Sequence, residues 1–405
     1  MPQSRCLIVT THFRPLVGGA LTVYDALARR APDQIELFTA STDYTCGSEI
    51  EGWQAFDANA PYKISRIAEI RPQMVPFNAS FARKIIAKLK SMLINRRVLQ
   101  ETVHRAVNGK FDVICIGAQD ALGWMVEPLK KQTDAKIIIY VHGEEVSQTA
   151  YSEKAEQCRK AALHAADGLI AVSSFTAQLL TSKYGVPADR VQLQTNGVDL
   201  NTFDGTLNEA DRSKYRLPPT SFVFACGRLV VRKGFDKLIE AWPAVVAAVP
   251  GTKLVIGGKG PLEAELQASV RKLGIGESVQ LLGWVEDGAL SSCYGFADLF
   301  IMPNRTMPDG DTEGFGLVFL EAAAMGTPST AGRAGGAVDA VIEGETGLFV
   351  DGNDVSEIST ALIDLLSNGE KRQTMALAAQ KHARTQGWNT KTTEFLAYIE
   401  RLSRS

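Results

Sequence analysis

The sequence has no apolar run that approaches the ~18 continuous residues needed to cross a membrane. Its six cysteines are scattered and include no C-x-x-C pair, which argues against a disulfide framework. Neither G-x-G-x-x-G nor G-x-x-x-x-G-K-[ST] occurs, so the sequence supports neither a dinucleotide-binding fingerprint nor a P-loop. The net charge of only −2 indicates that the chain as a whole does not bind nucleic acid.

What the chain does contain is typical of a globular protein with more than one domain. Its 405 residues are 45% hydrophobic, and at about 150 residues per domain they predict two or three domains. Cys6, Cys115 and Cys226 lie beside or within strand-like apolar runs, and we expect the six cysteines to be reduced, buried thiols. The apolar run after Arg5 is too brief for a signal peptide, and we therefore expect a cytoplasmic protein.

One segment concentrates positive charge. The first 200 residues carry a net charge of +3 and the remainder −5, and residues 70–100 hold seven cations and no acid. Apolar residues recur there at helical spacing among the cations: Phe77, Phe81, Ile85, Leu89 and Leu93. This pattern predicts that residues 77–97 form a helix lying on the anionic inner face of a membrane. The alternative is a core-facing helix with a solvated basic face.

Short apolar runs alternate with amphipathic helical patterns along the chain, which predicts parallel sheets covered by helices on both faces. The expected strands are residues 6–10, 35–39, 113–117, 137–142, 168–172, 192–195, 222–226, 253–257, 279–282, 298–302, 328–331 and 347–350. The expected helices are residues 21–30, 155–166, 175–184, 236–248, 262–273, 288–297, 317–325, 355–368 and 390–403.

The alternation breaks near residues 197–220, which we interpret as a linker. We therefore expect an α/β fold of two doubly wound, Rossmann-like domains, residues 1–200 and 201–387, facing each other across a cleft. A C-terminal helix at 388–405 has no strand after it and is free to cross back to the first domain. Ligands bind at the carboxyl ends of parallel strands, so one site between the two sheets is expected.

Glycine-rich loops follow strands in both expected domains and suit a bound phosphate. Gly18 and Gly19 open the first helix, where free N–H groups and the helix dipole attract an anion. Arg228 and Lys233 lie in a later strand-to-helix loop, where they can grip a pyrophosphate. The loop at Gly258 would let a nucleotide approach the main chain. The alternative for each glycine loop is a plain turn, and for the cationic loop it is a solvated loop, although its position at a strand end favours binding.

The richest motif contains two glutamates. Glu313 precedes a helix that begins near Gly316, and Glu321 is the only charge in an apolar run, so it is either exposed or paired. A carboxylate suits two vicinal hydroxyls, as on a ribose, while the backbone at the helix start suits a phosphate or a sugar hydroxyl. Asp309 and Asp311 form a D-x-D motif, but no apolar strand flanks it, and we expect no metal site.

Together these motifs resemble retaining glycosyltransferases of family 4, which have the GT-B architecture. The resemblance lies in the Gly pair, the G-R-L-x-x-R-K-G loop and the E-x7-E pair: Gly18-Gly19, Arg228, Lys233, Glu313 and Glu321. The V-H-G-E, N-G-V-D and G-W-V segments at 141–144, 196–199 and 283–285 support it. It covers essentially the whole chain and is strongest for phosphatidylinositol-mannosyltransferase-like and polysaccharide-assembly hexosyltransferases.

The resemblance implies a role for each motif residue. The implied catalytic residues are His142, Arg228, Lys233 and Glu313. The implied donor-binding residues are Gly18, Gly19, Gly258, Val285, Gly314, Phe315, Gly316 and Glu321. The cations would neutralise the leaving diphosphate, the glycine pair would meet its phosphate, and the first glutamate and the backbone after it would position the hexose. The second glutamate would hold the ribose, and the histidine would lie near the sugar; without the resemblance, it would be read as a packed or hydrogen-bonded residue.

The family implies transfer of a hexose from a UDP- or GDP-sugar to a lipid-linked or glycan acceptor in cell-envelope or polysaccharide assembly. The implied reaction is a front-face substitution with no cofactor and no metal, in which the leaving phosphate accepts the proton of the acceptor. Two alternatives remain. One is a GT-B enzyme acting on a soluble acceptor, such as a sucrose-phosphate-synthase-like transferase, an epimerase or a phosphorylase. The other is a non-catalytic module that binds a nucleotide sugar.

Overall fold

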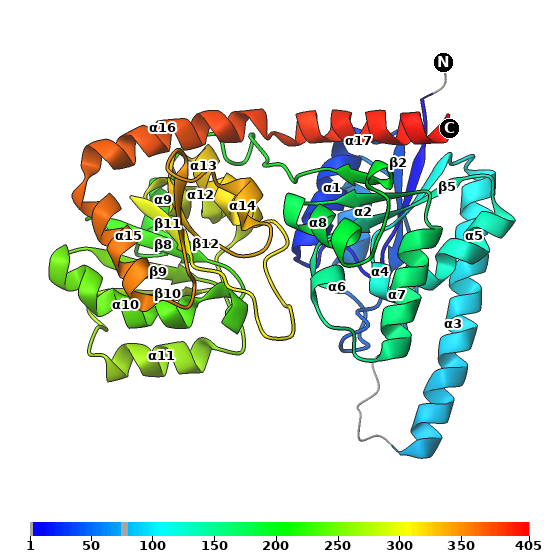
Figure 1. Ribbon diagram of the computed structural model, residues 1–405, viewed down its shortest axis with the longest axis horizontal. Coiled ribbons are helices and arrows are strands. Elements are labelled where there is room, and N and C mark those ends of the chain that lie inside the picture. The colour runs from blue at the N-terminus through cyan, green and yellow to red at the C-terminus, as the bar shows by residue number, and fades with distance from the viewer. Residues whose placement is uncertain (1–2, 74–79, 405) are drawn as a thin grey trace. The chain divides into compact units, whose positions relative to one another are not determined.

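The computed structural model describes residues 3–73 and 80–404, and the chain divides into two compact units. Unit 1 comprises Met1–Val172, Thr176–Gln194 and Lys391–Ser405. Unit 2 comprises Ser173–Phe175 and Thr195–Thr390. Each unit is built around one parallel sheet (Figure 1).

The sheet of unit 1 has seven strands in the order β3-β2-β1-β4-β5-β6-β7, and all its pairs are parallel. The strands are β1 (Cys6–Val9), β2 (Ile35–Ala40), β3 (Ile64–Ile67), β4 (Val113–Ile116), β5 (Lys136–Val141), β6 (Gly168–Ala171) and β7 (Val191–Leu193). The helices are α1 (Gly19–Arg30), α2 (Trp53–Asn59), α3 (Phe81–Asn108), α4 (Gln119–Leu122), α5 (Val126–Gln132), α6 (Glu144–Ser147), α7 (Glu153–Ala165), α8 (Ser174–Ser182) from Thr176 on, and α17 (Trp388–Ser403) from Lys391 on.

The sheet of unit 2 has six parallel strands in the order β10-β9-β8-β11-β12-β13. The strands are β8 (Phe222–Cys226), β9 (Lys253–Gly257), β10 (Val279–Gly283), β11 (Leu299–Met302), β12 (Ser329–Gly332) and β13 (Gly347–Val350). The helices are α9 (Glu209–Lys214), α10 (Phe235–Ala248), α11 (Glu263–Lys272), α12 (Asp287–Gly295), α13 (Leu317–Ala324), α14 (Ala337–Ala340), α15 (Val355–Ser367) and α16 (Gly369–Thr385).

Strand residues are buried on both faces of each sheet, as their continuous apolar runs predict. In β1 all four side chains are wholly buried, and in unit 2 so are Val223, Phe224 and Ala225 of β8. One layer of helices in unit 2 contains α10 with α11 and α15, both of which contact α10, and α12 and α13 lie on the other side of the strands (Figure 1). The two doubly wound, Rossmann-like folds expected from the sequence are therefore confirmed.

All twelve expected strands are present, with ends that differ by at most one or two residues. The sequence did not reveal β3, because its Ile-Ser-Arg-Ile run is short and half polar. It also did not reveal α16, whose buried residues are only Met375, Ala379 and Ala383. The expectation of buried thiols was wrong for Cys46 and Cys158, which are exposed, although all six cysteines are free.

The N-terminal half of helix α3 does not face the core, in contrast to the alternative considered from sequence. This half projects from unit 1 in Figure 1. Its large apolar residues there are exposed: Ile85, Ile86, Leu89, Met92 and Leu93. Only from Ile94 and Val98 onward does the helix bury apolar side chains in the core of unit 1. Of the apolar positions used to predict this helix, Phe77 lies outside the described residues.

Across the described ranges 3–73 and 80–404, no helix combines the length and the apolar character that a membrane span demands.

Candidate active site

Three loops of unit 2 pack against one another where β8, β9 and β10 end. Gly227 N–H donates to Gly257 O over 3.1 Å, and Gly258 N–H donates to Gly283 O over 2.6 Å. Gly258 has a φ of +134°, and a Cβ there would lie 1.9 Å from the oxygen of Gly227. Only glycine allows this approach, so the loop at Gly258 is fixed by its contact with the cationic loop.

The cationic loop brings two positive side chains to Glu313. Lys233 ends a 3₁₀ turn before α10, and its Nζ lies 2.5 Å from Oε2 of Glu313. Nη1 of Arg232 lies 3.3 Å from the same oxygen, and Nε of Arg232 lies 3.3 Å from Oδ1 of Asp311. Arg228 is exposed at the start of the same loop. The structure therefore brings Lys233 and Glu313 together and adds Arg232 as a further cation.

The electrostatics of Glu313 depend on these cations. Burial on its own would raise the pKa of this carboxyl group, because a buried charge loses its hydration. The charges of Lys233 and Arg232 outweigh burial and hold the pKa of Glu313 below its ordinary value. Glu313 is consequently an anion at neutral pH, with its charge balanced inside the fold.

The backbone after Glu313 is held in place by its contacts with Gly336. Gly336 N–H donates to Glu313 O over 2.7 Å, and a Cβ on Gly336 would lie 1.9 Å from Gly314 O. Gly316 begins α13 with a φ of +87°, and Phe315 is buried beside it. The segment Gly314–Gly316 is thus a fixed turn with its N–H groups at the start of a helix, which suits an anionic or hydroxyl-bearing ligand.

Glu321 lies one turn further along α13 and is paired, one of the two possibilities that its apolar surroundings allowed. The hydroxyl group of the buried Tyr294 donates to Oε2 of Glu321 over 2.9 Å. Burial raises the pKa of Glu321 to about 7, although the hydrogen bond from Tyr294 and the charge of Lys233 lower it. A carboxylate at this position is suited to two neighbouring hydroxyl groups.

Val285 follows the end of β10 and is buried against the loop rather than open to a ligand. Its Cγ2 would lie 3.0 Å from a Cβ on Gly257, and its side chain is 4% exposed. The adjacent Trp284 is 48% exposed. The structure therefore places Val285 where it shapes the strand end, and it presents Trp284 as the larger accessible surface.

In unit 1, His142 follows β5 and lies in an aromatic environment. Its ring stacks on Tyr140 with 5.0 Å between centroids, and its Nε2 lies 2.6 Å from the hydroxyl oxygen of Tyr24. The backbone N–H of His142 donates to the carboxylate of Glu145 over 3.1 Å. Burial lowers the pKa of His142 to about 3, so the ring is neutral at pH 7. The packed and hydrogen-bonded histidine considered from sequence is thus what the structure contains.

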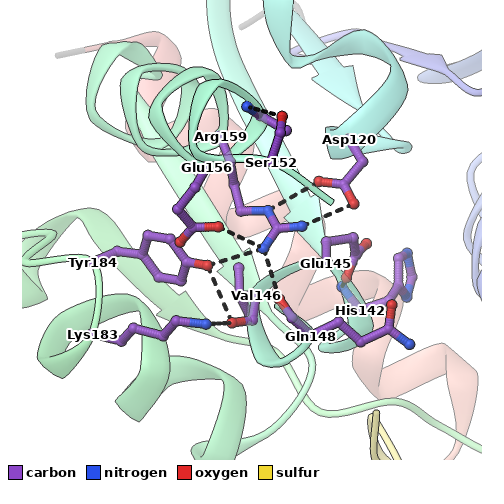
Figure 2. A network of polar contacts seen from close by, with 11 residues as sticks. Asp120, His142, Glu145, Val146, Gln148, Ser152, Glu156, Arg159, Lys183 and Tyr184 are labelled. Atoms are coloured by element: carbon purple, nitrogen blue, oxygen red, sulfur yellow. Dashed lines mark hydrogen bonds and ion pairs between the residues drawn. The ribbon is translucent and has the colours of Figure 1, made fainter. Parts of the chain in front are cut away.

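A buried arginine supports the loop that follows His142 (Figure 2). Arg159 makes a two-pronged ion pair with Asp120, with nitrogen–oxygen distances of 3.1 and 3.2 Å, and donates to Gln148 O over 2.9 Å. It also donates to the hydroxyl of Tyr184, which in turn donates to Val146 O over 3.2 Å. The network fixes the main chain at position 146, within the short helix α6, and at position 148, directly after it.

Gly18 and Gly19 lie at the start of α1 in unit 1. Gly18 has an extended φ of 178°, which any residue can adopt, so its conformation does not explain the glycine. A Cβ on Gly19 would meet no atom within 4 Å, so the space beside it is open. The first turn of α1 contains no acidic residue that would compete for an anion.

The D-x-D motif is occupied by protein contacts. Oδ1 of Asp309 accepts a hydrogen bond from the N–H of Asp311 over 3.1 Å, and Asp311 is paired with Arg232. Among the residues that the structure describes, no group of three or more His, Cys, Asp or Glu side chains is arranged to hold a metal ion.

Two family models divide the chain between them. The model described as Glycosyltransferase Family 4 matches residues 17–202, and the model described as Glycosyl transferases group 1 matches residues 208–382. A GDP-mannose-dependent monoacylated alpha-(1-6)-phosphatidylinositol monomannoside mannosyltransferase from Corynebacterium glutamicum is 32% identical over 93% of this chain and 93% of its own. The chain belongs to glycosyltransferase family 4.

Other proteins are similar to this chain in sequence or in fold. A GDP-mannose-dependent alpha-(1-6)-phosphatidylinositol monomannoside mannosyltransferase from Mycolicibacterium smegmatis is 35% identical over 70% of this chain and 75% of its own. Anabaena HepE, solved with UDP and glucose, superposes with a TM-score of 0.76 at 19% identity, covering 98% and 100% of the two chains. Sucrose-phosphate synthase from Thermosynechococcus elongatus superposes with a TM-score of 0.75 at 22% identity and full coverage of both chains.

This family 4 glycosyltransferase has the GT-B architecture, and it is a hexosyltransferase. Sequence reasoning did not single out Tyr24 and Arg159 beside and below His142 in unit 1, nor Arg232 and Tyr294 beside the two glutamates in unit 2. Arg232 lay inside the quoted cationic loop and was not selected. The other three lie on helices α1, α7 and α12, and no motif in the neighbouring sequence marks them. Each has a hydrogen-bond partner that is distant in the sequence.

Proposed function

We propose that this glycosyltransferase is a retaining enzyme that transfers a hexose from a nucleotide diphosphate sugar to a lipid-linked acceptor of the cell envelope. GDP-mannose is the first donor to test, because both mannosyltransferase relatives described above use it by name. The observation that carries the proposal is Glu313, an anion held by Lys233 and Arg232 in the loop before α13, the helix that contains Glu321. An ion cluster of this kind at the end of a parallel strand suits binding of a charged, hydroxyl-rich donor.

The proposed roles follow from the charge of each group. In the reaction, the bond between the anomeric carbon and the diphosphate oxygen breaks, and the diphosphate leaves with the electron pair. The acceptor oxygen bonds to that carbon on the same face and passes its proton to the departing phosphate. Lys233 and Arg228 neutralise the negative charge that develops on the diphosphate, an effect that commonly contributes about 3–4 kcal/mol per donor group.

The remaining candidates bind and orient the donor. Glu321 accepts hydrogen bonds from the ribose hydroxyls, and Glu313 with the backbone of Gly314–Gly316 positions the hexose. The N–H at Gly19, the first residue of α1, donates to the donor phosphate. Gly258 and Val285 define the strand ends beside the base. His142, which belongs to unit 1, lies near the sugar of the bound donor.

A panel of donors tests this proposal. The purified protein is incubated with GDP-mannose, UDP-glucose, UDP-N-acetylglucosamine and UDP-galactose, and thermal stability is measured for each. A true donor present at 100 times its Kd stabilises the folded state by about 2.7 kcal/mol. Transfer is then followed as nucleotide release in the presence of a phosphatidylinositol mannoside. The proposal is overturned if no donor stabilises the protein, and stabilisation without nucleotide release would identify a binding module.

We further propose that the N-terminal half of α3 places the enzyme on an anionic membrane surface. Five large apolar side chains are exposed there, and at 3.6 residues per turn they lie within about 120° of the helix circumference. Exposed cations flank this stripe: Arg83, Lys88, Arg96 and Arg97. Apolar side chains in the acyl region with cations against the headgroups are the arrangement of an interfacial helix.

A further inference from the structure

A buried tyrosine of unit 1 has its hydroxyl group between two partners. Tyr24 lies on α1 and is wholly buried. Its hydroxyl oxygen lies 2.8 Å from the carbonyl oxygen of Gly117, at the end of β4, and 2.6 Å from Nε2 of His142, at the end of β5. Both distances are those of a hydrogen bond, so each contact requires one proton between its two heavy atoms.

Counting protons assigns the tautomer of the histidine. A carbonyl oxygen carries no proton, and the hydroxyl of Tyr24 carries one. That proton must therefore lie between Tyr24 and Gly117. The contact between Tyr24 and His142 must then receive its proton from Nε2 of the imidazole. A neutral imidazole carries a proton on one nitrogen only, which leaves Nδ1 as a bare acceptor.

The surrounding packing holds the three groups in this arrangement. A Cβ on Gly117 would lie 2.8 Å from the ring of Tyr24, so the ring is pressed against the backbone of that strand end. Tyr140 stacks on His142 with an interplanar angle of 13° and meets Tyr24 edge-on at 5.7 Å. The histidine ring is thus fixed from one face by Tyr140 and at Nε2 by Tyr24.

We propose that Tyr24 is a positioning residue that holds His142 as the Nε2–H tautomer and thereby presents Nδ1 as a hydrogen-bond acceptor. In this form His142 accepts a hydrogen bond from a hydroxyl group and does not donate to a phosphate through Nδ1. The burial that keeps the ring neutral at pH 7 is consistent with this assignment. The use of Nδ1 toward a sugar hydroxyl rests on the proposed function, whereas the tautomer does not.

Nitrogen NMR of the full-length protein tests the tautomer directly. In protein labelled with ¹⁵N-histidine, with His142 assigned through the His142→Gln variant, Nε2 should have a pyrrole-type shift and Nδ1 a pyridine-type shift at pH 7. Tyr24→Phe should shift the population toward the Nδ1–H form. Tyr140→Phe is the matched control, because its buried hydroxyl has no hydrogen-bond partner among the described residues. That variant should leave the tautomer unchanged.

Kinetics add a second readout. With the donor identified by the panel above, Tyr24→Phe should lower kcat/KM by up to about tenfold, the value of one hydrogen bond, and Tyr140→Phe should not. A proton on Nδ1 in the unaltered protein would overturn the proposal, as would an unchanged tautomer in a folded Tyr24→Phe variant. If Tyr24→Phe does not fold, the spectrum of the unaltered protein decides alone. If no donor is turned over, the NMR result still stands and the proposed function fails separately.

Discussion

Lys233 and Lys237 form a matched pair of lysines four residues apart. Lys233 contacts the buried Glu313, whereas Lys237 pairs with Glu240 on the exposed side of α10 over 2.7 Å. We expect Lys233→Ala to lower kcat/KM about 100–1000-fold, because one charge stabiliser at a reacting group is commonly worth this much. Lys237→Ala should stay close to the unaltered enzyme. Equal activities in the two variants, each measured with a saturating acceptor, would remove Lys233 from the proposed mechanism.

The raised pKa of Glu321 predicts a pH-dependent stability. Its pKa is about 7 in the folded protein, against an ordinary value of 4.5. Between these values the folded state retains a proton that the unfolded chain releases, so this group makes folding less favourable as the pH rises, and its full cost is present above pH 7. Glu321→Gln removes that cost. The Tm of the Glu321→Gln variant should therefore exceed that of the unaltered protein, and the difference should be larger at pH 8 than at pH 5.

The comparison with Glu321→Gln isolates one carboxyl group. Burial also raises the pKa of Glu145 to about 7, but that residue is the same in both proteins and its effect cancels. A Tm difference that is constant from pH 5 to pH 8 would show that Glu321 titrates normally.

At the residue scale, sequence motifs pointed to the charged side chains of the candidate site more readily than to the side chains that support them. The spacing of Glu313 and Glu321 placed both on the loop and helix where the structure has them. Tyr24 and Tyr294 could not be found in this way, because each acts through hydrogen bonds to residues that are distant in the sequence. A tyrosine that completes such a bond has the same local pattern as one that only fills the core.

Helix α3 makes a prediction at the scale of an element. The double substitution Leu89→Glu and Leu93→Glu places two acids in the exposed apolar stripe, so it should abolish co-sedimentation with phosphatidylglycerol vesicles at low salt. Leu377→Glu on α16 is the control, because this leucine is 65% exposed, close to the 70% of Leu93, and lies outside the stripe. Failure of the unaltered protein to co-sediment would refute membrane binding and favour a soluble acceptor.

The turn after Glu313 predicts the effect of a single methyl group. Gly336 has a φ of −82°, which alanine adopts without strain, but its Cβ would lie 1.9 Å from Gly314 O. Gly336→Ala should therefore displace the turn, raise the KM for the donor and cost about 1–3 kcal/mol of stability. Gly276→Ala should change neither, because a Cβ there meets no atom within 4 Å. An unchanged KM in Gly336→Ala would separate this turn from donor binding.

Helices and strands with a continuous run of buried apolar residues were predictable from sequence. Those that bury few apolar side chains were not. The apolar runs of β8 and β9 were placed to the residue, because their strands are buried on both faces. Helix α16 has a mean hydropathy far below that of α10 and buries three small or flexible side chains, so its periodicity is weak. Strand β3 contains Arg66, whose guanidinium group pairs with Asp57, and such a polar run is read as a loop.

At the scale of the whole molecule, α17 supplies unit 1 with part of its core. Phe395 is wholly buried and its ring lies 6.4 Å from that of Tyr140. Phe395→Ala should lower the stability of unit 1 by about 3–5 kcal/mol through the cavity it leaves. The thermal melt should then show an earlier transition for unit 1, while donor-induced stabilisation of unit 2 persists. A single unshifted transition would contradict this role.

Unit 1 is not continuous in the chain, and this affects the order in which the protein can be completed during synthesis. Lys391–Ser405 reaches the ribosome exit only after Thr195–Thr390 has been made. At the usual 5–20 residues per second, that intervening segment takes about 10–40 s to translate. During this interval the nascent unit 1 lacks Phe395 and the other buried residues of α17. Unit 2, whose own chain is complete first, can therefore finish folding while the earlier unit still exposes the surface that its last helix will cover.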